Sequence, residues 1–488
     1  MANWRIKSLD SILATAEKKS LTRSLGAFQL TMLGIGGTIG TGIFVLTASA
    51  ATKAGPAMMV SFAIAGFVCF LTALCYAELC AMIPVSGSAY TFSYATFGEI
   101  IAWIVGWALV LEYAIASSAV AVGWSGYMVG LAERFFGSDI ANTFVHGPFD
   151  KEPGLINLPA MFIALAMAGL LIVGTKESAR FNAALVMIKI AALVMFLVLA
   201  LPEIDVANFS PFMPRGFFAH EIVDPFNSEL MISVGVSAAA ATIFFAFVGF
   251  DAVSTAAEET INPNRNIPIG LIGALGVSTV LYMLVAAAAT GSVGADPTGA
   301  LAQSNEALAY VLQAIGYGWG GNLLAIAAGV ALPSVILTLM YGQTRIFFVM
   351  ARDGLLPQVF STIHPRFNTP HIITAITGVF VALFASFFPV ESLAEISNSG
   401  TLLAFLMVAV AVLVLRRREP NRARPFRTPA VWVIAPLAAA GCGFLFFSLS
   451  NYTLLLFVGW VAIGLVVYFT YSRRRSNMGH GLADGGNA

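Results

Sequence analysis

Charged residues are the scarcest class in this 488-residue sequence: only 10% are Asp, Glu, Lys or Arg, while 58% are hydrophobic. Soluble domains carry about 25% charged residues, so this composition excludes a soluble globular protein. It predicts an all-α polytopic membrane protein, with room for about a dozen spans of ~20 apolar residues each. Because the 25 basic and 25 acidic residues cancel, nothing favours nucleic-acid binding.

Cysteine and histidine are also rare. The five histidines fall in loops, at span ends or in the tail, so no catalytic constellation within the membrane is indicated. No nucleotide-binding loop is present, which excludes transport driven by ATP. We therefore predict neither an enzyme nor a cofactor or metal. The four cysteines show no metal-site spacing and are interpreted as free thiols in the packing: Cys69, Cys75, Cys80 and Cys442.

Twelve apolar spans can be placed along the chain. An even number puts both termini on one side, and 20 of the 25 basic residues then fall on that side, against 4 on the other. The remaining one, Lys189, lies inside a span. Since cytoplasmic loops are enriched in Lys and Arg, we expect cytoplasmic termini. The expected spans are 28–51, 57–84, 99–131, 156–174, 180–201, 235–257, 267–291, 320–350, 371–388, 393–415, 430–449 and 453–472.

The first span is interrupted at 36–42, which reads GGTIGTG. Each glycine inside a helix costs about 1 kcal/mol relative to alanine. Broken backbone at membrane depth is tolerated only where it is buried in protein or lines a watery cavity. We interpret this stretch as a discontinuous helix whose free N–H groups face a ligand. The alternative is a glycine-rich face that lets two helices pack closely.

The sixth span contains a second candidate break. Gly249 lies mid-span and is followed two residues later by Asp251. This break comes five spans after the first, and corresponding breaks in two halves indicate an inverted-repeat transporter with a midplane site. The two breaks share negligible sequence similarity, so the repeat rests on span counting.

Five stretches together resemble the amino acid–polyamine–organocation superfamily, close to its cationic amino acid transporter family. They are LTMLGIGGTIGTGIFVLTA (30–48), YAELCAMIPVSGSAYTFSYATFGE (76–99), LEYAIASSAVAVGWSGY (111–127), FFAFVGFDAVSTAAEETINPNRNIPIGL (244–271) and YGQTRIFFVMARDGLLP (341–357). The resemblance implies 12 transmembrane helices in the LeuT-type fold, with broken helices 1 and 6.

That fold divides the chain into two inverted repeats of five spans and two peripheral spans. The resemblance also implies a location in the cell membrane, the inner membrane of a bacterium. The expected segments are a cytoplasmic head (1–27), the first repeat (28–201), an extracellular loop (202–234), the second repeat (235–415), a basic cytoplasmic loop (416–429), peripheral spans (430–472) and a cytoplasmic tail (473–488).

In this family the break in span 1 binds the substrate carboxylate and the break in span 6 binds the ammonium through main-chain carbonyls. Phe245 is also the expected aromatic gate, with core packing as the alternative. We expect Asp251 to cap the second half-helix rather than contact substrate, and Leu339 to belong to the core. The resemblance assigns Thr38, Ile39, Gly40, Thr41 and Gly42 to the carboxylate, and Phe245, Ala246 and Val248 to the ammonium.

Glu112 and Lys189 are ionisable residues inside spans 3 and 5. Charge at that depth is costly enough to suggest a function, although a structural ion pair between the two would explain them equally. By resemblance, Glu112 lies near the substrate side-chain pocket. Lys189 reaches toward the broken span 1 and serves proton coupling, because burial disfavours its charged form.

The leading hypothesis is a secondary active amino acid transporter that imports small neutral or cationic amino acids with protons. An exchanger without net proton movement is the alternative in the same class, and a channel or amino acid-sensing receptor is the alternative in another. The expected partners are an amino acid, protons and the lipid bilayer. The substrate's identity and the oligomeric state stay open at this point.

Overall fold

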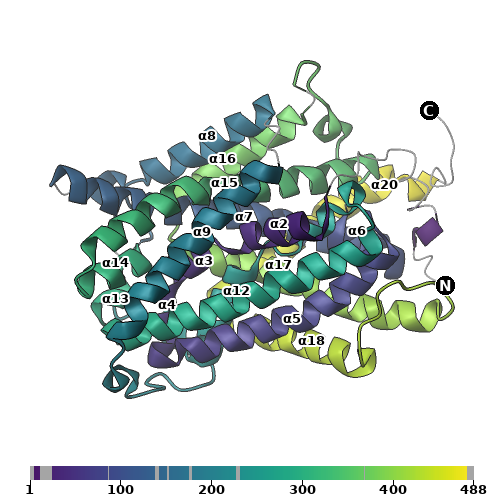
Figure 1. The fold of residues 1–488 in the computed structure, drawn as a ribbon. Helices are drawn as coiled ribbons and strands as arrows, with labels where there is room; N and C mark the ends of the chain where they lie inside the picture. Colours follow the sequence, from purple (N-terminus) through teal and green to yellow (C-terminus); the bar gives the residue numbers. More distant parts are fainter. Residues whose placement is uncertain are drawn as a thin grey trace.

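In the computed structural model, long helices run roughly parallel along the molecule, and residues near both termini lie at one end of the bundle (Figure 1). We call this end the terminus end. Among the residues that the structure describes, seven helical stretches are long and apolar enough to cross a membrane, so the chain is a polytopic membrane protein. The basic residues Lys18, Lys19, Arg23, Lys151 and Lys176 lie outside the described residues. The structure describes residues 5–10, 12, 25–85, 87–137, 142–150, 153–174, 179–226, 231–367 and 369–480.

The uninterrupted helices form the frame of the bundle. They are α5 (Met58–Met82), α7 (Glu99–Phe136), α8 (Leu158–Val173), α9 (Ala179–Ala200), α12 (Pro263–Val293), α15 (Gly318–Arg352), α16 (His371–Phe387), α17 (Val390–Arg418), α18 (Val431–Phe446) and α19 (Asn451–Val467). Helix α7 packs against α15 and α17, while α12 packs against α5. Such helices satisfy their own backbone groups, as a bilayer requires.

Two stretches of helix in the centre of this frame are interrupted. The first consists of α2 (Ala27–Thr38), α3 (Thr41–Phe44) and α4 (Leu46–Ala54). The second consists of α10 (Val236–Ile243), the 3-10 turn η5 (Phe244–Phe247) and α11 (Ala252–Thr255). Both interruptions fall where glycine patterning predicts them, and almost every described side chain in them is buried.

Several segments expected to be loops contain short elements. The segment 84–98 holds α6 (Ser88–Thr96), whose residues are all buried, so it has no amphipathic pattern to reveal it. Strands β1 (His220–Val223) and β2 (Met231–Val234) pair antiparallel, with His220 opposite Val234, and correct the all-α prediction. Four residues are too few for a periodic signal. The remaining elements are η1 (Gly55–Ala57), η2 (Asn142–Phe144), η3 (Leu201–Glu203), η4 (Val206–Phe209), η6 (Ala257–Glu259), α13 (Ala300–Gln303), α14 (Ala307–Ala314), η7 (Gln358–Ser361), the π-helix η8 (Tyr468–Ser472), α20 (Arg473–Arg475) and η9 (Met478–His480).

A buried carboxylate ties the two ends of the chain together at the terminus end. Glu99, the first residue of α7, is only 2% exposed. Its oxygens accept hydrogen bonds from Arg5 at 3.0 Å, Tyr94 at 3.1 Å, Tyr468 at 3.0 Å and from the hydroxyl of Ser476. We call these five residues the Glu99 cluster. A buried charge needs such a set of partners.

A second buried carboxylate lies at the opposite end of the bundle. Glu395 of α17 forms an ion pair with Lys53 of α4, with 2.5 Å between Nζ and Oε1. It also accepts hydrogen bonds from Thr242 at 2.9 Å, Ser450 at 2.7 Å and Thr453 at 3.1 Å. This Glu395 cluster links both interrupted helices to α17 and α19.

Candidate functional site

The backbones of the two interruptions lie in close contact. A Cβ on Gly37 would lie 2.8 Å from the carbonyl oxygen of Gly249, and a Cβ on Gly249 would lie 2.8 Å from that of Gly37. Only glycine allows backbones this close, and Gly249 also has a φ of 103°, which glycine adopts readily. A Cβ on Gly42 would collide with the backbone of Ala246. The glycines therefore agree with both interpretations of the sequence, the discontinuous helix and the close-packing face, because they break the helix and permit close packing.

The first break leaves three backbone N–H donors, and the carbonyls that they would bind, outside the helical hydrogen-bond pattern. Ile39 is extended and Gly40 is non-helical. The backbone N–H groups of Gly40, Thr41 and Gly42 have no acceptor within the described ranges. In a continuous helix they would bind the carbonyls four residues earlier, at Gly36, Gly37 and Thr38. The Thr41 hydroxyl, which is also buried, has no partner in the described part of the chain either.

Two side chains from other helices bind the freed carbonyls. Lys189 of α9 donates from Nζ to the Gly36 oxygen at 2.9 Å. Tyr282 of α12 places its hydroxyl 2.8 Å from the Thr38 oxygen and 3.0 Å from the Ala246 oxygen. A hydroxyl has one proton, so Tyr282 donates to one carbonyl at a time. It bridges the first break to the second.

The second break leaves backbone carbonyl oxygens with spare capacity to accept hydrogen bonds. Val248 turns to extended backbone after η5, and its N–H binds the Phe245 oxygen at 3.1 Å. The Val248 carbonyl accepts no hydrogen bond within the described ranges. Carbonyl oxygens have two lone pairs, so Phe245 and Ala246 retain acceptor capacity as well.

A small cavity of about 10 Å³ lies between the two breaks, about the space of one water molecule. Six residues assigned by resemblance line it, and Ile39, Ala246 and Glu112 do not. Leu339, expected to be ordinary core, contributes to the wall together with Val120 and Val335. The lining residues are Gly37, Thr38, Gly40, Thr41, Gly42, Val120, Phe245, Val248, Val335 and Leu339.

Lys189 and Glu112 do not form the ion pair that we considered. Lys189 is fully buried, and its one partner in the described part of the chain is the Gly36 carbonyl. The Lys189 Nζ donates to the Gly36 carbonyl, which in an unbroken helix would accept from the Gly40 N–H. A cation at the carboxyl end of a half-helix is also electrostatically favourable.

Glu112 occupies a separate buried site on α7. Its carboxylate makes no direct hydrogen bond among the described residues. The Asp251 Oδ2 accepts a hydrogen bond from the Tyr113 hydroxyl at 2.7 Å. Asp251 makes no side-chain cap on α11, so the capping prediction was wrong. Its carboxylate points to α7 instead.

Sequence reasoning missed several of these residues. Tyr282, Val120 and Val335 sit in apolar spans where nothing distinguishes them from core residues, and Ser278 contacts the Thr38 hydroxyl at 3.0 Å. A tyrosine in mid-span was the only available hint, because its hydroxyl needs a partner when buried. The described residues hold no cluster of three potential metal ligands.

Comparison with known proteins decides the family, because a model described as amino acid permease matches residues 25–471. The chain belongs to the amino acid permease family. This confirms the resemblance seen in its motifs. The permease is 45% identical over 477 residues to the branched-chain amino acid permease BcaP of Bacillus subtilis (strain 168), a match that covers 97% of this chain and 98% of that protein.

Other relatives of this permease carry different substrate names. The methylthioribose transporter of the same Bacillus strain is 42% identical over 474 residues, covering 97% of this chain and 98% of that protein. Human cationic amino acid transporter 4 is 35% identical over 430 residues, which are 86% of this chain and 63% of that protein. These relatives are transporters rather than enzymes.

Proposed function

We propose that this permease is a secondary active transporter that imports amino acids by alternating access. The observation that carries the proposal is the set of free N–H groups at Gly40, Thr41 and Gly42, beside a cavity that the second break closes. Free N–H groups at a half-helix start favour a carboxylate. Free carbonyls favour an ammonium. Every amino acid carries both groups.

The substrate carboxylate would bind at 38–42, where the Thr41 hydroxyl adds a donor. The ammonium would bind the carbonyls of Phe245, Ala246 and Val248. Because the cavity has room for about one water molecule, a substrate can enter only when the breaks separate. Phe245, which lines the cavity and is buried, is the proposed gate for that movement.

The same proposal includes the architecture. We assign twelve spans to two inverted repeats (28–201 and 235–415) and two peripheral spans (430–472), with broken helices 1 and 6 at α2–α4 and α10–α11. The excess of basic residues in the head, in 416–429 and in the tail supports a cytoplasmic terminus end. The loop 202–234 is then extracellular, and the protein lies in the cell membrane.

Lys189 is the proposed proton-coupling residue. As an ammonium it donates to the Gly36 carbonyl and holds α9 against the first break. As a neutral amine it could release that carbonyl and let α2 move. A proton on Lys189 would therefore favour one arrangement of the break over the other, which links proton movement to the opening of the cavity.

The walls of the cavity favour a neutral, apolar substrate side chain. Val120, Val335 and Leu339 are aliphatic, and Glu112 lies outside the lining. The name of the branched-chain permease relative agrees with this preference. A cationic side chain would need Glu112, which becomes accessible only if the cavity extends along α7.

Uptake by purified protein in liposomes tests the proposal. The panel contains labelled leucine, alanine, arginine and methylthioribose, each with and without an inward proton gradient. We expect leucine or alanine to accumulate above equilibrium only with the gradient. Exchange in preloaded liposomes, without accumulation under the gradient, would favour the exchanger. Uptake of methylthioribose alone would overturn the amino acid proposal.

The Lys189→Ala variant separates coupling from binding. We expect it to lose accumulation under the gradient while substrate binding survives. Lys189→Arg is the matched variant, since guanidinium keeps its charge, and it should also fail to accumulate substrate. Wild-type accumulation by Lys189→Ala would show that this lysine is structural.

A further inference from the structure

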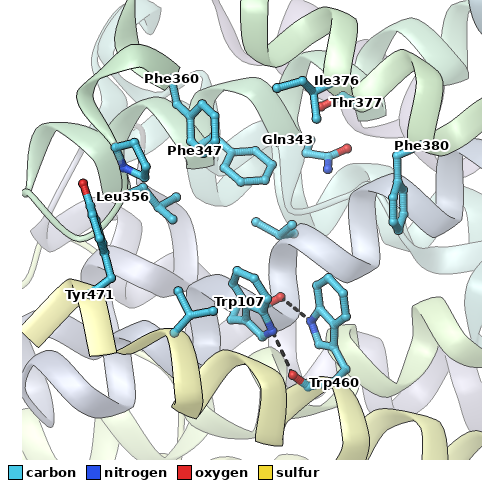
Figure 2. Close-up of a pocket in the computed structure, with 13 residues that line it drawn as sticks. Trp107, Gln343, Phe347, Leu356, Phe360, Ile376, Thr377, Phe380, Trp460 and Tyr471 are labelled. Atoms are coloured by element: carbon cyan, nitrogen blue, oxygen red, sulfur yellow. Dashed lines mark hydrogen bonds between the residues drawn. The ribbon is translucent and has the colours of Figure 1, made fainter. Parts of the chain in front are cut away.

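A larger cavity of about 320 Å³ lies among α7, α15, α16 and α19, outside the small cavity between the breaks. Figure 2 shows aromatic side chains around it, with Trp107 and Trp460 together on one side. Cavities of this size are within the range of small-molecule sites, which are mostly apolar with a few polar groups. This cavity meets that description.

The tryptophan wall is held in place by its own hydrogen bonds. Trp107 and Trp460 stack with ring centroids 4.8 Å apart and an interplanar angle of 17°. Each indole N–H donates to the backbone carbonyl of the other residue, both at 2.9 Å. Rotation of either ring to fill the cavity would break one of these bonds. The cavity is therefore preformed on this side.

Two buried polar side chains line the cavity, and an oxygen of each has no partner among the described residues. Gln343 and Thr377 are each 2% exposed. Within the described ranges, Gln343 Oε1 and Thr377 Oγ1 make no hydrogen bond. One turn earlier on α16, Thr374 donates to the Pro370 carbonyl at 2.8 Å. In Figure 2 Gln343 and Thr377 lie on the side of the cavity opposite Trp107 and Trp460. A buried oxygen without a partner costs about 1–3 kcal/mol, so a ligand that pairs with both would be stabilised.

The helices that frame the cavity present apolar side chains outward. Ile376 lines the cavity and is 49% exposed. Val379 and Leu383 of α16 and Ile463 of α19 are exposed as well. In a bilayer such surfaces face lipid tails, so a ligand would reach the cavity from the membrane.

We propose that this cavity binds an uncharged single-chain amphiphile whose hydroxyl group pairs with Gln343 and Thr377. A hydroxyl can donate to Gln343 Oε1 and accept from Thr377 Oγ1. A charged headgroup is excluded because none of the described residues that line the cavity is charged, and a buried unpaired charge is far costlier than a hydroxyl. The cavity volume is at the lower limit for ligand sites and therefore fits one hydrocarbon chain.

Such a ligand would touch the helix that also borders the transport cavity. Val335 and Leu339 of α15 line the small cavity, and Gln343 and Phe347 line the larger one. These four residues follow one another at intervals of four, which places them along one face of α15. The proposal itself concerns binding alone and does not depend on the transported substrate.

Quenching of tryptophan fluorescence by a brominated probe tests the site. The probe is ω-bromoundecanol, and bromoundecane, which lacks the hydroxyl, is its matched control. Both are added to the purified full-length protein in lipid nanodiscs. We expect saturable quenching, with half-quenching by the alcohol at a concentration about tenfold lower than by the alkane, as one satisfied hydrogen bond would give. Trp460→Phe should reduce the quenched fraction.

Conservative variants identify the polar partners. Thr377→Val and Gln343→Leu should each remove most of the tenfold preference for the alcohol while leaving alkane quenching unchanged. Thr374→Val, the same change one turn away, should keep the preference. Equal half-quenching by alcohol and alkane in the wild type would overturn the proposal, showing that the cavity takes hydrocarbon only. A preference that survives in both Thr377→Val and Gln343→Leu would overturn it too.

Discussion

Replacing Tyr282 by phenylalanine removes the hydroxyl that bridges the two breaks. The ring would keep its contacts with Phe62 and Phe247, whose centroids lie 6.0 and 5.2 Å away. What is lost is a hydrogen bond shared between the carbonyls of Thr38 and Ala246. The net worth of such a bond is about 1 kcal/mol, and a carbonyl left buried without a donor raises the cost to as much as about 3 kcal/mol.

That loss should appear in substrate binding. If the hydroxyl holds the breaks in the closed arrangement, about 1 kcal/mol shifts the balance toward the open form about fivefold, and about 3 kcal/mol shifts it more than a hundredfold. Because the closed cavity has no room for a substrate, Tyr282→Phe should strengthen apparent affinity for labelled leucine by at least about fivefold in a scintillation proximity assay. Tyr452→Phe, at a tyrosine that is 58% exposed, is the control. Affinity within twofold of wild type in Tyr282→Phe would refute the bridging role.

Three further predictions use the same binding assay or thermal unfolding. Gly42→Val should abolish binding of every amino acid, because the valine side chain would collide with the Ala246 backbone. The control Gly40→Ala should fold and bind, since its Cβ would lie 3.4 Å from the Val335 side chain. Wild-type affinity in Gly42→Val would contradict this prediction. Glu112→Gln should weaken arginine more than alanine, and equal losses would point to a structural role. Glu395→Gln should destabilise the protein by about 3–5 kcal/mol, because the buried Lys53 loses its charged partner; an unchanged melting curve would argue against it.

The broken helices could be predicted because glycine acts locally. GGTIGTG at 36–42 weakens a helix wherever it occurs, and Gly249 does the same five spans later. The contact of Lys189 with the first break followed from the family resemblance, since charge at mid-span already marked this residue. These are properties of single residues and their neighbours in the sequence.

The partners of the breaks could not be predicted, because they depend on how helices pack. Tyr282 reaches two carbonyls from α12, and its surroundings in the sequence resemble those of any core tyrosine. Asp251 follows a break, which suggested a cap, yet the nearer donor is Tyr113 on another helix. Val120 and Val335 became wall residues only when α7 and α15 closed around the cavity. Spacing within one helix holds no information on such contacts.

The Glu99 cluster sets an order for the assembly of this protein during synthesis. Glu99 and Tyr94 leave the ribosome early, but Tyr468 and Ser476 follow more than 350 residues later. Domains usually begin to fold from the N-terminal side while translation continues. Arg5 and Glu99 therefore lack the last members of the Glu99 cluster, or use temporary partners, until residue 476 has been made. The step that completes the terminus end therefore comes late in synthesis, so a ribosome stalled before residue 468 should display an Arg5 segment that proteases can still cut.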